Sequence, residues 1–387
     1  MYSETLAERK GTGWFRCGEE IGYFPNSVRR SQDGGCYTLT FKLTFPFCDD
    51  TVYLAHCFPY TWTRLQRQLA ALEHFDPETN VLQRTRLCAT LAGNRVDLLT
   101  ITNFTSCAEA IAKRRGVMLT ARVHPGETGA SWIMEGLLKF LVSSSPRAME
   151  LRDMYVFKIV PMLNPDGVIN GNYRCSLAGV DLNRQWKTPH PLKHRPIFCA
   201  KEVLKQLAST REVAMYCDFH GHSSKHNVFM YGCEATGPKK HSEKVFPLLM
   251  AEVCDVFSAN DCHFMMKKDK ESCGRVVVFK ELNIVNSYTL EASFAGADTG
   301  PSAGIHFNGS HYQAMGCKFL DALLLYGQSA ADPTGGYVRQ LHQDICQTIA
   351  SRPAVEPEPT TKKKPQKKRT TRKERVPQRK PAASRRR

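Results

Sequence analysis

The chain has 387 residues, of which 42% are hydrophobic and 10% aromatic, a composition typical of a protein with a sizeable buried core. Its formal net charge is +16, but residues 361–387 hold fourteen of the lysines and arginines and a single acid, so the remainder is close to neutral. The fifteen cysteines occur singly without a CxxC pair, and neither a signal-like stretch nor a run of eighteen apolar residues is present. We therefore expect neither a disulfide-framed secreted module nor a membrane-spanning protein, but a cytoplasmic protein with reduced thiols.

The first part of the chain has the alternating pattern of β-strands. CYTLTFKLTF (36–45) and VYLAHCF (52–58) are rich in β-branched and aromatic residues, with Asp, Gly and Pro between them. A helix is predicted over 61–73, where apolar residues recur every three to four positions. We assign residues 1–75 to a β-rich amino-terminal domain.

From residue 76 to 330, predicted strands alternate with predicted helices. The strands are near-continuous apolar runs at 97–104, 116–123, 155–163, 213–220 and 286–294. The helices lie at 131–144, 243–257 and 310–327. This alternation predicts an α/β domain with a mixed, mostly parallel sheet flanked by helices. A helical or linker segment (331–352) follows, and the composition of residues 353–387 predicts a disordered basic tail.

Two of the predicted strands end in residues that bind metal ions. HPGET places His124 and Glu127 three residues apart in the turn after one strand, and DFHGHS places His220 at the end of another. Strand ends of this kind border the ligand crevice of an open α/β sheet, so the three side chains are expected to meet. Two histidines and one glutamate leave the fourth position of a tetrahedral zinc site open for water, as in catalytic sites. The alternatives are a chance HxxE match beside a core histidine, and His222 in place of His220.

The segments around these ligands narrow the choice. HPGET, PMLNPDGV, GNYRCSLAGVDLNRQW, DFHGHS, VFMYG and SYTLEASF stand in this order within residues 88–295. The series resembles the M14 metallocarboxypeptidases, and in particular their cytosolic carboxypeptidase (tubulin deglutamylase) branch. Upstream, WFRCGEEIGYFPNS and FPYTWTRLQ are similar to that branch's amino-terminal β domain. This domain is usually longer, so we expect a truncated form here. The resemblance implies a zinc carboxypeptidase fold and one zinc ion as cofactor.

The resemblance also implies roles for single residues. Glu291, in YTLEAS, matches the general base that moves the proton of the attacking water. Arg174, in NYRC, matches the arginine that stabilises the oxyanion. Asn183 and Arg184, in DLNR, match the pair that holds the substrate's terminal carboxylate. Asp181 matches a carboxylate that orients the first metal-binding histidine; a helix cap is the alternative for it, and a surface salt bridge for either arginine.

Two features depart from the digestive members of the family. Gly126 stands where those enzymes have an arginine, as it does in the cytosolic branch. The digestive enzymes also carry a tyrosine on a mobile loop some twenty residues before the catalytic glutamate, and residues 262–286 contain none. The source of that hydrogen-bond donor is left open by the sequence.

The charge around the expected side-chain pocket predicts the substrate preference. The run MMKKDKESCGRVVVFKE (265–281) carries five basic residues just before the catalytic strand. Arg275 lies close to where the digestive enzymes place the floor of this pocket. A guanidinium there favours a terminal glutamate or aspartate; a solvated charge on a loop is the alternative.

These features together predict a zinc metallocarboxypeptidase that removes carboxy-terminal or side-chain-linked glutamates from acidic protein tails, with polyglutamylated tubulin as the expected partner. A zinc amidase acting on small acyl amino acids and a non-catalytic microtubule-binding protein are the alternatives; the intact DLNR block argues against the first and the intact Glu291 against the second. The basic tail is expected to attract acidic microtubules, with nuclear import as the alternative. It contains no aromatic residue for base stacking, which argues against nucleic acid. We expect a cytoplasmic location, with microtubules, cilia or the nucleus as further sites.

Overall fold

The computed structural model describes residues 1–29, 35–75, 80–331 and 336–350. Its central element is a seven-stranded sheet in the order β10-β11-β9-β7-β8-β6-β5. The strands are β5 (Leu82–Ala89), β6 (Arg95–Ile101), β7 (Arg115–Ala121), β8 (Tyr155–Val160), β9 (Val213–His222), β10 (Val228–Tyr231) and β11 (Ser287–Ser293). β8, β7, β9 and β11 are mutually parallel, whereas β10, β6 and β5 each pair antiparallel with their neighbours. The predicted fold class, a mixed and mostly parallel sheet flanked by helices, is confirmed.

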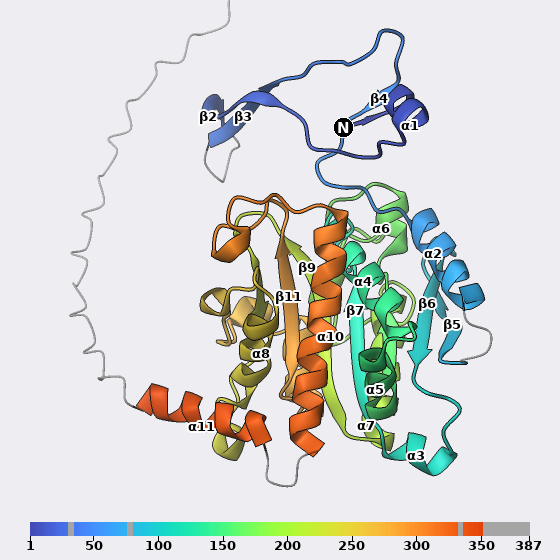
Figure 1. The fold of residues 1–387 in the computed structure, drawn as a ribbon, viewed down its shortest axis with the longest axis vertical. Coiled ribbons are helices and arrows are strands. Elements are labelled where there is room, and N and C mark those ends of the chain that lie inside the picture. Colours follow the sequence, from blue (N-terminus) through green and yellow to red (C-terminus); the bar gives the residue numbers. More distant parts are fainter. Residues whose placement is uncertain (30–34, 76–79, 332–335, 351–387) are drawn as a thin grey trace, which may run out of the picture.

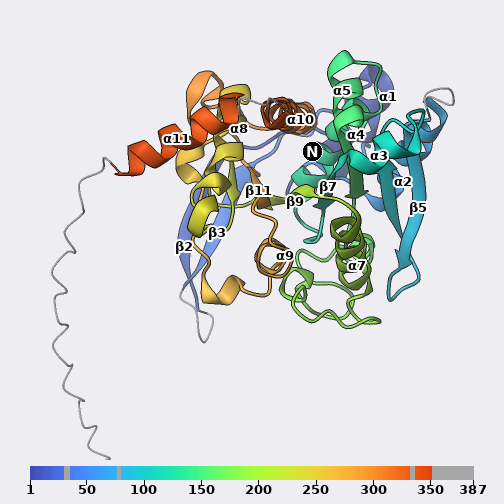
Figure 2. The same cartoon turned by 90° about the horizontal axis from the view of Figure 1, so that it is seen from below.

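Helices cover both faces of this sheet, as Figure 2 shows. One face packs against α2 (Trp62–Phe75), α4 (Thr128–Leu141), α5 (Pro146–Met154), α8 (Val245–Val253) and α10 (Gly309–Ala331). The other packs against α7 (Arg195–Thr210) and α9 (Gly274–Leu282). Successive residues of β7 enter opposite cores: Leu119 belongs to the first hydrophobic cluster and Met118 to the second. Burial on both faces explains why the parallel strands read as continuous apolar runs.

The parallel pairing brings the candidate site residues to one edge of the sheet. His124 and Glu127 lie in the turn between β7 and α4, and His220 lies near the end of the neighbouring strand β9. Glu291 of β11 is directly opposite His220 in the parallel register. Four residues from three separate stretches of sequence therefore meet at the carboxyl ends of adjacent strands.

The amino-terminal segment lies beyond this same edge (Figure 1). β1 (Tyr2–Ser3) pairs with β4 (Val52–Tyr53), α1 (Glu4–Lys10) follows β1, and β2 (Glu19–Arg29) pairs with β3 (Gly35–Lys42). These pairings agree with a small β-rich amino-terminal unit. In the β2–β3 ribbon, the side chains of Tyr23, Tyr37, Leu39 and Phe41 are 46–70% exposed.

Several elements differ from the sequence-based prediction. The predicted strand over 52–58 is wrong beyond Tyr53, because the chain there leaves its partner strand and contacts α4 and the turn before it instead. Trp132 Nε1 donates to the carbonyl of Phe58 (3.2 Å), for example. β10, α5 and α9 were not predicted as separate elements, because short or two-sided apolar segments have no clear period. β5 and α7 were also missed, although α7 has 16 residues and buries one face.

The remaining helices are short or lie at the carboxyl end. They are α3 (Ala108–Lys113), α6 (Pro165–Ile169) and α11 (Gly336–Ala350), together with short 3-10 turns. α11 falls within the segment predicted as helix or linker, and the predicted disordered tail (353–387) lies outside the described residues. No helix among the described residues is long and apolar enough to cross a membrane.

Candidate active site

Three predicted ligand atoms converge at the carboxyl edge of the sheet. His124 Nδ1 lies 2.7 Å from Glu127 Oε1, and His220 Nδ1 lies 2.9 Å from Glu127 Oε2. The two Nδ1 atoms are 3.2 Å apart. His124 and His220 are buried and Glu127 is nearly so, and together they form a group whose donor atoms could hold one metal ion. His222 is not part of this group, so the structure favours His220 over the alternative ligand.

The outer nitrogen of each histidine contacts a carboxylate. His124 Nε2 is 3.0 Å from Asp181 Oδ1, and His220 Nε2 is 2.7 Å from Asp218 Oδ2. When each Nε2–H donates to its carboxylate, the Nδ1 lone pair points to the centre of the group, which is the arrangement that a cation requires. The role predicted for Asp181 agrees with this contact. Asp218 was missed, although DFH on a strand carried a signal: residues two apart share a face.

The charges of the group also suit a cation. Burial acts to raise the pKa of Glu127, but His220 and His124 outweigh it and hold the pKa well below its usual range. Burial likewise acts to raise the pKa of Asp181. The hydrogen bond from His124 and the charges of Arg174 and Arg184 outweigh burial and lower this pKa. Both carboxylates are therefore anionic at neutral pH. Three donor atoms whose lone pairs point inward, next to two anionic carboxylates, fit a divalent metal such as zinc.

Glu291 lies beside the metal-ligand group with its carboxylate free of hydrogen bonds to other described residues. It is half-buried and lines the same cavity as His124, Glu127 and His220. Burial, together with the negative charges of Glu127 and Asp218, raises the pKa of Glu291 to about 8, against the opposing effect of His220 and Arg275. A carboxylate without a structural partner, at the edge of a possible metal site, has the position of a general base.

The NYRC and DLNR residues surround this group. Arg174 Nη2 lies 2.7 Å from Asp181 Oδ2, and its Nη1 lies 4.0 Å from Glu127 Oε1. Asn183 Oδ1 accepts a hydrogen bond from the Gly274 backbone at the start of α9 (2.9 Å). Arg174, Asn183 and Arg184 all line the cavity. The salt bridge expected as the alternative for Arg174 is present, but it holds the guanidinium at the cavity wall.

Arg275 belongs to helix α9, so the alternative of a solvated loop charge is wrong. The residue is 9% exposed and lines the cavity. Its Nη1 donates to Thr289 Oγ1 (3.5 Å), and its guanidinium carbon lies 5.4 Å from the centre of the Tyr231 ring. Its buried Nε has no hydrogen-bond partner, and no carboxylate of the described residues forms an ion pair with it. Arg275 is thus a buried cation whose binding capacity is partly unused.

The cavity around these residues has a volume of about 640 Å³. Lys267 and Lys270, which belong to the basic run noted in the sequence, contribute to its wall. Sequence reasoning missed further lining residues, namely Tyr173, Lys225, Tyr231, His263 and Thr289. Tyr231 is the last residue of β10 and pairs opposite Thr289 of β11, so it faces the cavity from the neighbouring strand. Burial raises the pKa of Tyr231, as does the charge of Glu291, so its hydroxyl stays protonated at neutral pH.

Comparisons with known proteins identify the class of this domain. Residues 70–260 match the model of the family described as zinc carboxypeptidase (peptidase M14). The chain is similar to a solved metallo-carboxypeptidase from Burkholderia cenocepacia, with a TM-score of 0.62, 26% identity and 70% of each chain covered. The fold and the His–Glu–His group thus define residues 70–260 as a domain of the zinc carboxypeptidase (peptidase M14) family.

Within that family, the similar curated proteins are cytosolic carboxypeptidases. Cytosolic carboxypeptidase 2 of Danio rerio is 47% identical over 329 residues, which are 84% of this chain and 45% of the relative. Cytosolic carboxypeptidase 2 of Mus musculus is 46% identical and is covered to 38% of its length. The chain spans less than half the length of these relatives.

Proposed function

We propose that the protein is a zinc carboxypeptidase that removes carboxy-terminal or side-chain-linked glutamates from acidic protein tails. The observation that carries this proposal is Arg275, a buried guanidinium without a carboxylate partner in the described part of the chain, which lines the cavity that contains the metal-ligand group and Glu291. A buried charge without a partner is unfavourable. A substrate side chain that brings its own carboxylate would remove this cost, so the pocket favours glutamate or aspartate.

The residues around the cavity divide the reaction among them. A zinc ion held by His124, Glu127 and His220 would supply Lewis acidity and a water molecule of lowered pKa. Glu291 is placed to accept the proton of the attacking water and to return it to the leaving amine. Arg174, fixed by Asp181, is placed to donate hydrogen bonds to the oxygen on which negative charge develops.

Binding of the free carboxylate makes such an enzyme an exopeptidase. Arg184 and Asn183 are assigned to this group, because a planar guanidinium can meet a carboxylate with two parallel hydrogen bonds. Arg275 would bind the side-chain carboxylate at the end of the pocket, with Lys267 and Lys270 adding positive charge at the wall. One substrate residue would then be held by two separate cationic groups, which selects both the chain end and its acidic side chain.

Polyglutamylated tubulin tails are the partner that fits this chemistry best, since they present glutamates both in line and on side-chain branches. The basic residues 361–387 lie outside the described residues, and their charge would add long-range attraction to such a polyanionic surface. We place the protein in the cytoplasm, where cysteines stay reduced; the relatives named cytosolic carboxypeptidases support this location.

Mass spectrometry of peptide substrates tests the proposal. Peptides that end in several glutamates, one series linear and one branched through a glutamate side chain, are incubated with the full chain in the presence and absence of a zinc chelator. We expect the peptide mass to fall in steps of ~129 Da, the mass of one glutamyl residue. This loss should stop when the metal is removed and resume when zinc is added. If no chelator-sensitive loss of glutamate occurs on either series, the proposed function is wrong.

A further inference from the structure

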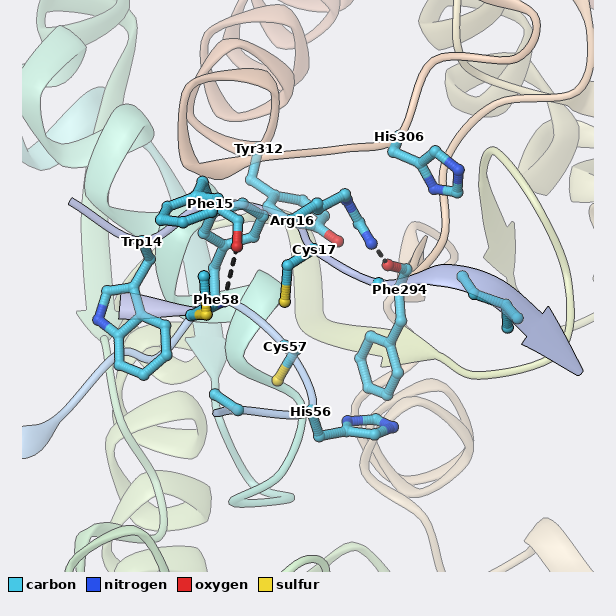
Figure 3. Close-up of a pocket in the computed structure, with 14 residues that line it drawn as sticks. Trp14, Phe15, Arg16, Cys17, His56, Cys57, Phe58, Phe294, His306 and Tyr312 are labelled. Atoms are coloured by element: carbon cyan, nitrogen blue, oxygen red, sulfur yellow. Dashed lines mark hydrogen bonds between the residues drawn. The ribbon is translucent and has the colours of Figure 1, made fainter. Parts of the chain in front are cut away.

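A second cavity lies outside the site described above, between the amino-terminal segment and the sheet edge. Its volume is about 420 Å³. It is bounded by residues 14–18, by the irregular stretch 55–58, by the loop after β11 and by Tyr312 of α10 (Figure 3). It has no lining residue in common with the active-site cavity. Arg16, His56 and His306 at its wall are exposed, so a ligand can reach it from solvent.

Only a thin aromatic layer separates this cavity from the metal-ligand group. The ring of His56 lies edge-on 6.1 Å from Tyr173 and 5.6 Å from Phe294. Tyr173 lies directly on Gly126 and Phe294 on Gly221, so closely that a Cβ at either glycine would come within 2.5 Å of the ring. These two glycines adjoin the ligands Glu127 and His220 in sequence. The rings of His56, Tyr173 and Phe294 therefore form one partition between the two cavities, next to the position of the bond to be cleaved.

The direction of the substrate chain points to this partition. Asn183, Arg184 and Arg275 occupy the part of the active-site cavity assigned to the terminal residue. The polypeptide upstream of the cleaved bond must leave past the oxyanion-binding Arg174 and its neighbour Tyr173. Tyr173 packs against the His56 ring, which is already part of the second cavity. This step rests on the function proposed above.

The walls of the second cavity suit an acidic polypeptide. Arg16 Nη2 donates to the carbonyls of Phe294, Ala295 and Phe307 (3.0–3.2 Å), and this fixes the guanidinium at the wall. His56 and His306 add two groups that can donate hydrogen bonds, and none of the lining residues is acidic. Aromatic rings of Trp14, Phe58, Phe294 and Tyr312 supply the apolar surface.

From this geometry we infer that the second cavity is an extended subsite, which holds residues of an acidic substrate chain several positions before the cleaved bond. The amino-terminal segment thereby contributes to substrate binding through Arg16 and His56. The active-site cavity alone selects the terminal residue. The second cavity selects for a chain long enough, and acidic enough, to reach it.

The dependence of rate on peptide length tests this inference. kcat/KM is measured for glutamate-terminated peptides from an amino-blocked dipeptide up to eight residues, each with an acidic upstream sequence, and for an eight-residue peptide with a serine-rich upstream sequence. We expect kcat/KM of the wild-type chain to rise about tenfold from the shortest to the longest acidic peptide, and less for the serine-rich one, since one charge-assisted contact has that order of effect.

Variants separate binding from folding. Arg16→Gln and Ala55→Phe, which remove a cation and fill the cavity respectively, should abolish the rise with length and leave the dipeptide within about twofold of wild type. Lys10→Gln makes the same charge change at an exposed residue that does not line the cavity, and it should retain the rise. A wild-type rate independent of length, or an equal loss on the dipeptide and the long peptide in both cavity variants, would overturn the inference. Failure of the wild-type chain to cleave any peptide would instead overturn the proposed function.

Discussion

The Glu291 carboxylate forms no hydrogen bond or ion pair with another residue in the described part of the chain, although it lies among charged neighbours. We expect Glu291→Gln to lower kcat by at least ~100-fold, because proton transfer by a positioned carboxylate contributes about 10²- to 10⁴-fold. Zinc content should stay at that of the wild type, because Glu291 is not one of the three ligand residues. Steady-state kinetics with metal analysis checks both statements. Substantial turnover in the variant would show that another group is the base.

Substitution of Arg275 is expected to change substrate specificity more than stability. Arg275→Ile should reduce the preference for terminal glutamate over phenylalanine, measured as the ratio of kcat/KM values, by ~10-fold or more. The thermal midpoint of this variant should not fall by more than a few degrees, because the Arg275 side chain has a vacant buried donor and forms no ion pair with the described residues. Arg275→Lys is the matched control, and it should keep part of the preference. An unchanged preference in the isoleucine variant would show that Arg275 does not bind the substrate side chain.

Tyr231 supports Arg275 with its ring rather than with its hydroxyl. The Arg275 guanidinium lies over the Tyr231 ring at 5.4 Å, and the His263 ring is nearly parallel to the Tyr231 ring, with 6.2 Å between the ring centres. A cation–π contact of a desolvated arginine contributes about 1–2 kcal/mol. We therefore expect Tyr231→Ala to weaken the glutamate preference by about 5- to 30-fold and Tyr231→Phe to preserve most of it. If the phenylalanine variant loses as much as the alanine variant, the hydroxyl itself contacts substrate.

Strand β9 supplies both a metal ligand and the group that orients it. His220 and Asp218 are two residues apart and so lie on one face, where Thr120 of β7 also donates a hydrogen bond to Asp218 (2.7 Å). Asp218→Asn should weaken zinc binding by about 10- to 100-fold, because the amide cannot accept the Nε2–H bond as strongly. Competition with a chelating dye measures this affinity. Wild-type affinity in the variant would contradict the assigned orientation of His220.

The metal-binding turn between β7 and α4 is held by hydrogen bonds on two sides. Arg122 is buried at φ +59°, and its guanidinium donates to the Pro125 carbonyl (2.8 Å) and to Ser131 Oγ (2.9 Å). On the other side, Cys57 of the amino-terminal segment contacts the Gly126 carbonyl, and Thr128 donates to the Cys57 sulfur. The metal-binding turn is thus fixed by a strand end, a helix and a segment some seventy residues earlier in the chain.

The molecule as a whole concentrates negative charge where the strands meet. Glu127, Asp181 and Asp218 surround the two histidines, so a bound cation would relieve the repulsion between these carboxylates. A metal that binds the folded state alone stabilises it by RT ln(1 + [L]/Kd), about 4 kcal/mol at 1,000 Kd. We expect a chelator to lower the thermal midpoint by several degrees and zinc to restore it. Glu127→Gln should reduce this difference strongly; equal midpoints with and without metal in the wild type would argue against a metal in this group.

The amino-acid sequence by itself determined the chemistry and the layers of the fold. The candidate site residues stand at fixed local spacing in five short motifs, HxxE, DFHGHS, NYRC, DLNR and YTLEAS. The parallel strands are apolar throughout because both of their faces are buried. These are local signals, which depend on neighbours in sequence.

Only the tertiary structure decided what surrounds these motifs. Tyr231 reaches the pocket because β10 pairs antiparallel with β11, Arg275 is buried because α9 packs on the sheet, and the stretch 54–61 crosses the metal-binding turn instead of continuing a strand. Such contacts join positions tens to hundreds of residues apart. No local period encodes them, because they depend on the order in which strands pair and on which segment covers the sheet edge.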